Sequence, residues 1–174
     1  METKQKGDIA EQAAIVAAMK LGWGVSHPLG DRLPYDLIFD VQGTLVKAQV
    51  KSAWLHRPTQ NYVVDNRRTK TNRRIMLREA YSPNDFDFAL IFLEEINIFY
   101  VLPVHDFIKY GSAITIVESV KRQRKPQSAK FRNAWNLISQ WAAHEETHVA
   151  ISAKFGEPSH HGNPEPSSGL PEKV

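Results

Sequence analysis

The sequence predicts an α/β fold in which helices flank a central mixed β-sheet. Segment 8–20 is rich in alanine and contains no Pro or Gly, which favours a helix. Two pairs of strand-like segments follow, within 35–51 and 87–104, and each pair is divided by a short turn. Segment 129–143 spaces its apolar residues as an amphipathic helix does. Strands between two terminal helices are typical of a layered α/β domain.

The first predicted helix starts after Gly7 and ends near Gly22. Asp8 is a good N-cap residue, and Glu11 stands three positions later, at the spacing of a capping box. Glu11 also shares one helix face with three small or apolar residues, Ala14, Ile15 and Ala18. We therefore expect this face to pack closely on the sheet, with Glu11 able to serve the cap and also to point into a site.

The first pair of strands is the most informative stretch of the sequence. Segments 35–40 and 45–51 alternate like strands around the turn at 41–44. Alternation places Val46, Ala48 and Val50 on one face, and Lys47, Gln49 and Lys51 on the other. Asp36 on the neighbouring strand would lie across from Gln49 and Lys51. The polar face is thus either a candidate metal and phosphate site or simply the solvent side of a hairpin.

The remaining elements complete the predicted sheet and its connections. Segments 87–92 and 96–104 are almost wholly apolar, which is typical of strands at the buried centre of a sheet. We also predict strands at 23–27 and 62–64, an Arg-rich loop at 65–71, a short helix at 106–110, an edge strand at 114–117 and a basic loop at 121–128.

The composition indicates a single domain at 1–150 followed by a disordered tail at 156–174, which is rich in Pro, Ser, Gly, His and Glu. The chain contains no cysteine, which excludes disulfides and thiol catalysis. No apolar run reaches the ~18 residues of a membrane span, and the first residues are too polar for a signal peptide. These features predict a soluble, intracellular protein in the cytoplasm.

Positive charge is concentrated in two blocks, although the formal net charge is only +3. Segment 51–80 has eight Lys or Arg residues against two acids, and segment 121–132 has six basic residues and no acid. Such blocks in an otherwise acidic chain indicate a polyanionic partner such as DNA. The candidate DNA-contacting residues are Arg67, Arg68, Lys70, Arg73, Arg74, Lys121, Arg122 and Arg124. Either block alone is equally compatible with a solvated loop.

Glu11, Asp36 and the pair Gln49-x-Lys51 occur in an order that resembles the PD-(D/E)xK nucleases, the restriction-endonuclease-like superfamily. The resemblance is closest to its intron-encoded homing endonucleases that carry Gln in the third motif. It rests on the segments KQKGDIAEQAAI, HPLGDRLPYDLIFD, AQVKSA, YSPNDFDFALIF and FYVLPV. It extends from about Thr3 to Val104 and implies the restriction-endonuclease-like core.

The resemblance also implies roles for these residues. Glu11, Asp36 and Gln49 would hold Mg²⁺, for which Mn²⁺ could substitute, with Gln49 as a neutral oxygen ligand or a water-orienting group. Lys51 would orient the attacking water and stabilise the charged phosphorane. Two departures from the family pattern are visible: Gln49 replaces an acidic residue, and Tyr35 separates Pro34 from Asp36. The first departure predicts a metal that is held less tightly, or in smaller number.

The implied function is metal-dependent, site-specific cleavage of double-stranded DNA by a homodimer or homotetramer, since cutting both strands needs two active sites. A Holliday junction resolvase shares the fold and the catalytic residues and is one alternative. The other is a non-catalytic DNA-binding protein in which Gln49 marks a degenerate site. A formal HExxH match, His144-Glu145-Glu146-Thr147-His148, is typical of zinc proteases. Because we expect it at the frayed end of the last helix, we interpret it as solvated.

Overall fold

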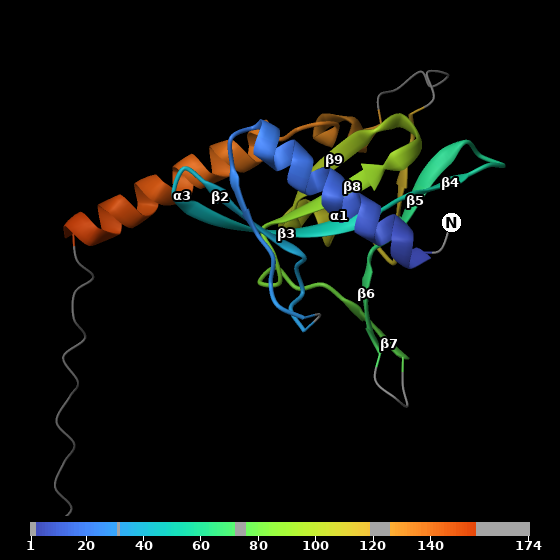
Figure 1. Cartoon of the computed structure of the whole chain (residues 1–174), viewed down its shortest axis with the longest axis horizontal. Helices are drawn as coiled ribbons and strands as arrows, with labels where there is room; N and C mark the ends of the chain where they lie inside the picture. Colours follow the sequence, from blue (N-terminus) through green and yellow to red (C-terminus); the bar gives the residue numbers. More distant parts are fainter. Residues whose placement is uncertain (1–2, 31, 72–75, 119–125, 156–174) are drawn as a thin grey trace, which may run out of the picture.

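The computed structural model describes residues 3–30, 32–71, 76–118 and 126–155 (Figure 1). Its α-helices are α1 (Thr3–Lys20), α2 (Val104–Phe107) and α3 (Asn136–Phe155). Its strands are β1 (Gly24–Ser26), β2 (Leu37–Val41), β3 (Thr44–Ser52), β4 (Trp54–His56), β5 (Asn61–Asp65), β6 (Arg67–Thr71), β7 (Met76–Ala80), β8 (Phe88–Leu93), β9 (Ile98–Pro103) and β10 (Ala113–Ile116). The sequence predicts seven of these strands and does not predict β4, β6 and β7.

The central sheet has five strands in the order β1-β2-β3-β8-β9. Strands β3 and β8 pair in parallel, and the other neighbours pair antiparallel, so the sheet is mixed. The α/β fold with a central mixed sheet is therefore confirmed. The predicted hairpin is also confirmed, because Leu37 of β2 lies opposite Ala48 of β3. Its turn is formed by Gln42 and Gly43, both with positive φ.

Strand β8 divides the interior into two hydrophobic clusters, since its side chains alternate between the faces of the sheet. Phe88, Leu90 and Phe92 join the first cluster, which also contains alanines of α1 and Ile138 and Ala142 of α3. Ala89, Ile91 and Leu93 join the second cluster, with residues of β5, β10 and α2. All of β8 is buried, as its sequence predicts. Strand β9, in contrast, lies at the edge of the sheet rather than at its centre.

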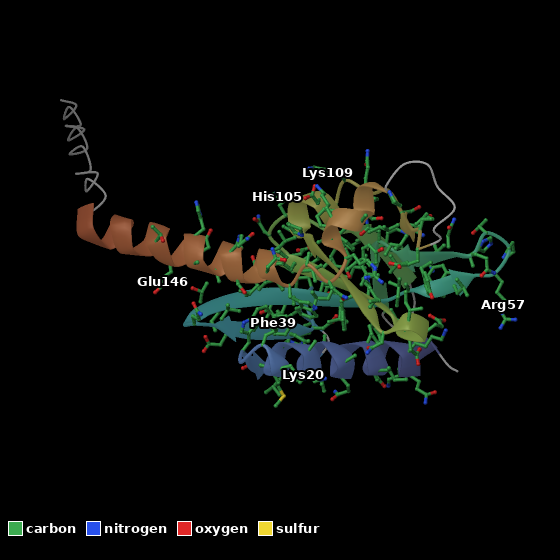
Figure 2. The ribbon with its side chains drawn as sticks, turned by 90° about the horizontal axis from the view of Figure 1, so that it is seen from above. Lys20, Phe39, Arg57, His105, Lys109 and Glu146 are labelled. Atoms are coloured by element: carbon green, nitrogen blue, oxygen red, sulfur yellow. The ribbon has the colours of Figure 1, made fainter. Side chains whose placement is uncertain are left out.

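Helix α1 begins earlier than the sequence predicts. It starts at Thr3 and continues through Gly7, so the capping-box prediction for Asp8 and Glu11 is wrong, and both residues lie inside the helix. Ala10, Ala14 and Ala18 have no exposed surface, which allows the helix backbone to approach the sheet closely. Figure 2 shows α1 lying alongside the sheet. This close packing carries Glu11 to the polar side chains near the start of β2.

Two small sheets follow β3. One has the order β10-β5-β4, which confirms β10 as an edge strand. The other consists of β6 and β7, which pair antiparallel from Arg67 opposite Ala80 to Thr71 opposite Met76. The prediction of a loop at 65–71 is therefore wrong. The polar segment has no apolar period and forms strand β6 because it pairs with β7 in a hairpin. Figure 1 shows this hairpin projecting from the body of the protein.

The last helix begins later and extends further than the sequence predicts. Residues Gln127–Phe131 form a 3₁₀ helix, and Asn133 adopts a positive φ of 48°, which separates it from α3. Asn133 stays with the sheet because its amide donates to the Phe99 carbonyl and its side chain accepts from the Phe99 amide. The HExxH match thus lies inside α3 rather than at a frayed end. None of the helices in the described ranges has the length and hydropathy needed to cross a membrane.

Candidate active site

The four residues proposed for catalysis line one cavity of about 410 Å³. Glu11 comes from α1, Asp36 from the residue before β2, and Gln49 and Lys51 from the polar face of β3. Arg67 and Arg68 of β6 line the same cavity. The fold thus brings together carboxylates, an amide and basic groups that are up to 57 positions apart in the sequence.

Asp36 is fixed against β3 by three hydrogen bonds. Its amide donates to the Ala48 carbonyl at 3.0 Å, which continues the strand pairing by one residue. Its Oδ2 accepts from the Val50 amide at 2.8 Å and from Gln49 Nε2 at 2.5 Å. The Gln49 side chain is buried and also donates to the Val50 carbonyl. The carboxylate therefore has a defined position on the edge of the cavity.

The two carboxyl groups are held in surroundings that disfavour their charged forms. Burial, together with the neighbouring charges of Asp36 and Asp8, raises the pKa of Glu11 to about 7. Burial also raises the pKa of Asp36, while the Val50 hydrogen bond and Lys51 act in the opposite direction. Two carboxyl groups that repel each other in a partly dry cavity form a site that a cation would stabilise.

Lys51 is directed into the cavity by contacts with the β6–β7 hairpin. Its Nζ donates to the Arg67 carbonyl at 3.2 Å and lies 5.0 Å from the centre of the Tyr81 ring. Burial lowers the pKa of Lys51, and Asp36 and Asp65 partly offset this by attraction. The ammonium group is therefore poorly hydrated and close to Asp36, in the cavity that Glu11 also lines, where a phosphate would meet it.

The donor set fits Mg²⁺ better than a metal that needs many protein ligands. No group of three or more His, Cys, Asp or Glu suited to a metal ion occurs within the part of the chain that the structure describes. Glu11 and Asp36 supply two carboxylates, and Gln49 supplies an amide. Mg²⁺ commonly binds through one or two carboxylates, keeps several waters and takes further oxygens from phosphate. The cavity provides space for such waters and for a substrate phosphate.

Comparison with known proteins identifies the family of this chain. The sequence pattern of the PD-(D/E)XK endonucleases matches residues 1–138, most of the chain. The chain belongs to this family. It is also similar to a solved structure described as that of a bacterial homing endonuclease, I-Ssp6803I, with 60% sequence identity and a TM-score of 0.79. The match covers 84% of this chain and 99% of that one. No protein with a curated description matches the chain.

The structure describes three of the eight residues predicted to contact DNA in this PD-(D/E)XK endonuclease. Arg67 and Arg68 lie at the cavity, where Arg67 Nε is 3.4 Å from Asp65 Oδ1 and Arg68 Nη2 donates to the Arg32 carbonyl. Lys70 lies in β6, next to them in the sequence. The other five predicted contacts lie outside the described residues: Arg73, Arg74, Lys121, Arg122 and Arg124.

Sequence reasoning did not assign three polar or aromatic side chains that also line the cavity, His27, Tyr35 and Tyr81. Tyr81 stands in the segment YSPNDFDFALIF, which carries part of the family resemblance, but the turn signal that follows it is typical of a structural turn before a strand. Asp85 and Asp87, in the same segment, do serve the structure: Asp85 accepts from the Ser82 amide, and Asp87 accepts from the Lys47 amide. Neither of these carboxylates lines the cavity.

Proposed function

We propose that this PD-(D/E)XK endonuclease cleaves double-stranded DNA at a specific sequence by metal-dependent hydrolysis. The observation that carries the proposal is the convergence of Glu11, Asp36, Gln49 and Lys51 on one cavity, with Arg67 and Arg68 beside it. The nuclease domain is assigned to 1–150. The similarity to I-Ssp6803I, described as a homing endonuclease, supports sequence-specific rather than general cleavage.

Glu11 and Asp36 would hold Mg²⁺, or Mn²⁺ in its place, with Gln49 completing the protein ligands. When bound, such a cation polarises the phosphate and lowers the pKa of a water molecule. The Val50 amide and Gln49 Nε2 hold Asp36 in the position from which it would bind the cation. A bound cation would lower the raised pKa of Glu11, so metal binding and deprotonation of Glu11 would be linked.

Lys51 orients the attacking water and stabilises the transition state. In the reaction, the attacking water gives up a proton to solvent as its oxygen bonds to phosphorus, one phosphorus–oxygen ester bond breaks, and the departing oxygen takes up a proton from solvent. Negative charge accumulates on the phosphoryl oxygens in the transition state. The poorly hydrated ammonium of Lys51, fixed before the substrate binds, stabilises that charge more strongly than bulk water does. Its contribution is therefore to the cleavage rate more than to DNA affinity.

The basic residues of the hairpin serve DNA binding. Arg67 and Arg68 next to the cavity suit phosphates that flank the cleaved bond, and residues further along the hairpin could reach the bases of a groove. A cut in both strands requires two such cavities, so the active form is a symmetric homodimer or homotetramer. The basic segments outside the described residues, with Arg73, Arg74, Lys121, Arg122 and Arg124, would extend the DNA-binding surface.

The proposal is tested by incubating the protein with a random-sequence duplex library and, separately, with a four-way junction. Each substrate is treated in Mg²⁺, in Mn²⁺ and in EDTA, and the ends produced are sequenced. We expect ends that share one symmetric motif, formed with either metal and absent in EDTA. The Lys51→Ala variant should produce no ends, whereas Lys47→Ala, altered on the same strand face, should produce the same ends as the wild type.

Three outcomes would contradict the proposal. Cutting confined to the four-way junction would assign the protein as a junction resolvase. Tight duplex binding without cleavage in either metal would identify a DNA-binding protein with a degenerate site. Cleavage that persists in EDTA, or that Lys51→Ala leaves unchanged, would place the chemistry elsewhere in the molecule. Sedimentation of the complex with a short target duplex measures the number of subunits, and a one-to-one complex would contradict the symmetric assembly.

A further inference from the structure

We propose that Tyr81 is a positioning residue for Lys51, and that the base of the β6–β7 hairpin couples DNA binding to the placement of this ammonium group. The inference rests on the role proposed for Lys51 above. It assigns a function to a side chain that contributes neither a metal ligand nor a proton donor to the reaction.

The ammonium of Lys51 is held between a carbonyl and an aromatic ring. Its Nζ lies 3.2 Å from the Arg67 carbonyl oxygen and 5.0 Å from the centroid of the Tyr81 ring. A cation within about 6 Å of such a centroid is attracted by the negative face of the ring, and more strongly where water is excluded. The residue Tyr81 is only 8% exposed, and it lines the cavity. The two contacts restrict a long, flexible side chain to one direction.

The ring itself cannot move freely. Tyr81 packs edge-on against Phe86 and Phe107, with centroids 5.1 and 5.9 Å away, and these two rings also contact each other at 5.6 Å. Phe86 and Phe107 have no exposed surface. The aromatic group is therefore part of the second hydrophobic cluster and presents one ring to the active site.

The Arg67 carbonyl is equally well fixed. The preceding residue, Asn66, is buried, and its Nδ2 donates to the carbonyls of Phe107, Tyr110 and Gly111 at 3.1, 2.8 and 3.0 Å. Asp65 accepts from the Arg67 amide and also lies 3.3 Å from Arg78 of β7. Asp65 thus joins the two strands of the hairpin close to the contact with Lys51.

Both groups that hold Lys51 belong to the base of the same hairpin. Arg67 begins β6 and pairs with Ala80, the last residue of β7, and Tyr81 follows directly. Arg68, next to the carbonyl that Lys51 contacts, faces the cavity. Any tilt of the hairpin on DNA therefore moves the carbonyl and the ring together and shifts the ammonium group. We infer that a duplex which engages the hairpin correctly brings Lys51 into its reactive position.

The test compares Tyr81→Leu, which removes the ring, with Tyr81→Phe, which keeps it. Single-turnover cleavage of the duplex selected above is measured with saturating enzyme, and DNA affinity is measured in EDTA. We expect Tyr81→Leu to slow cleavage about tenfold with affinity within about twofold, because placement is lost while phosphate contacts remain. Tyr81→Phe should retain a rate within about twofold of the wild type. In a Lys51→Ala background, Tyr81→Leu should have no further effect on the residual rate.

A matched control is Tyr62→Leu, which removes another buried tyrosine from the same hydrophobic cluster but outside the cavity. It should lower the melting temperature comparably and leave the rate of the folded protein unchanged. If the proposed function is right and the inference wrong, Lys51→Ala abolishes cleavage while Tyr81→Leu cleaves at the wild-type rate. Equal slowing by Tyr81→Phe and Tyr81→Leu would assign the effect to the hydroxyl and also overturn the inference.

An NMR measurement on the wild-type protein tests the contact without cleavage. Protons on the Lys51 carbon next to the ammonium should resonate upfield of ordinary lysine in the wild type, because they lie near the Tyr81 ring. Tyr81→Phe should retain this displacement. Lysine protons at the ordinary frequency in the wild type would show that the ring does not hold Lys51 and would overturn the inference, even if the protein cleaved none of the DNA substrates.

Discussion

Lys47 and Lys51 stand four residues apart on the same face of β3, and their surroundings are of the same kinds. Each Nζ donates to a backbone carbonyl, Asn84 for Lys47 and Arg67 for Lys51, at 3.3 and 3.2 Å. Each lies near a tyrosine ring, Tyr35 at 6.0 Å and Tyr81 at 5.0 Å. Each also has a nearby aspartate, but the two aspartates do different things.

The aspartate near Lys47 is Asp87, and it holds the fold together. Its Oδ2 accepts from the Lys47 amide at 2.7 Å, its own amide donates to the Lys47 carbonyl, and its carbonyl accepts from Val104. Asp36, near Lys51, also accepts a hydrogen bond from a strand amide. Its carboxylate, however, lies beside Gln49 in a cavity that a second carboxyl group also lines. Contacts of a lysine Nζ with a backbone carbonyl and a tyrosine ring are therefore not enough to mark an active site. Convergence of carboxyl groups on a space that a substrate can enter makes the difference.

The largest expected effect separates the two lysines. Lys51→Ala should reduce single-turnover cleavage about a thousandfold or more, because it removes charge stabilisation from the transition state. Lys47→Ala should change the rate by less than about twofold, since its ammonium lies outside the cavity. Gel shifts in EDTA should show near wild-type DNA affinity for both variants. Equal losses of binding and cleavage in Lys51→Ala would contradict its catalytic role.

Gln49→Glu should increase the difference between the surroundings of Lys51 and Lys47, because it restores the third carboxylate of the family pattern next to Lys51. We expect the Mg²⁺ concentration for half-maximal cleavage to fall about tenfold, since affinity for a hard cation increases with ligand charge. In EDTA the variant should melt at a lower temperature, because it replaces the Gln49–Asp36 hydrogen bond with repulsion. Titration calorimetry with Mg²⁺ measures the affinity directly. An unchanged affinity would show that residue 49 does not contact the metal.

Asp87→Ala should have the opposite consequence from Asp36→Ala. Removing Asp87 leaves the Lys47 amide without its acceptor and should lower the free energy of unfolding by about 1–3 kcal/mol. Cleavage measured below the melting transition should stay near the wild-type rate. Asp36→Ala should remove cleavage and metal binding at any temperature. Denaturant unfolding of both variants, paired with single-turnover rates, checks this, and a catalytic defect in folded Asp87→Ala would remove the distinction.

The sequence allowed the central sheet and the core of the site to be predicted because both depend on local pattern. Alternation in 45–51 placed Gln49 and Lys51 on one face, and the apolar run at 87–92 identified a buried strand. The position of Asp36 next to Gln49 then followed from the hairpin. Roles for these residues came from the family resemblance, which the match over residues 1–138 supports.

What the sequence did not predict depends on pairing and packing partners that the local pattern does not identify. Strand β6 is polar and becomes a strand only by pairing with β7, and the role of Tyr81 depends on packing against Phe107, 26 positions away. Gly7 predicts a helix boundary, but α1 runs through it. Phe131 and Ala134 are buried at helical spacing, but the positive φ of Asn133 interrupts the backbone there, so α3 starts only at Asn136. In each case packing overrides a local preference.

The smallest expected effect concerns the stability of the metal-free protein. The folded pKa of Glu11 is about 7, above the ordinary value of 4.5, so the folded state binds this proton more tightly than the unfolded state does. The contribution of protonated Glu11 to the free energy of unfolding is fully present below pH 4.5 and is lost as the pH rises through about 7. Glu11→Gln keeps a neutral group there and should lose less stability over this range.

In EDTA, we expect wild-type melting temperature to fall by about 2–4 °C more than that of Glu11→Gln between about pH 5 and about pH 8, since solvent around a partly buried carboxyl weakens the effect. Mg²⁺ should raise the wild-type melting temperature more at the higher pH, because binding displaces the proton. Lys47→Ala is the matched control and should follow the wild type. If the melting temperatures of Glu11→Gln and the wild type changed in parallel with pH, the pKa of Glu11 would not be raised by burial and by the charge of Asp36. The difference between the surroundings of the two lysines would then rest on Asp36 alone.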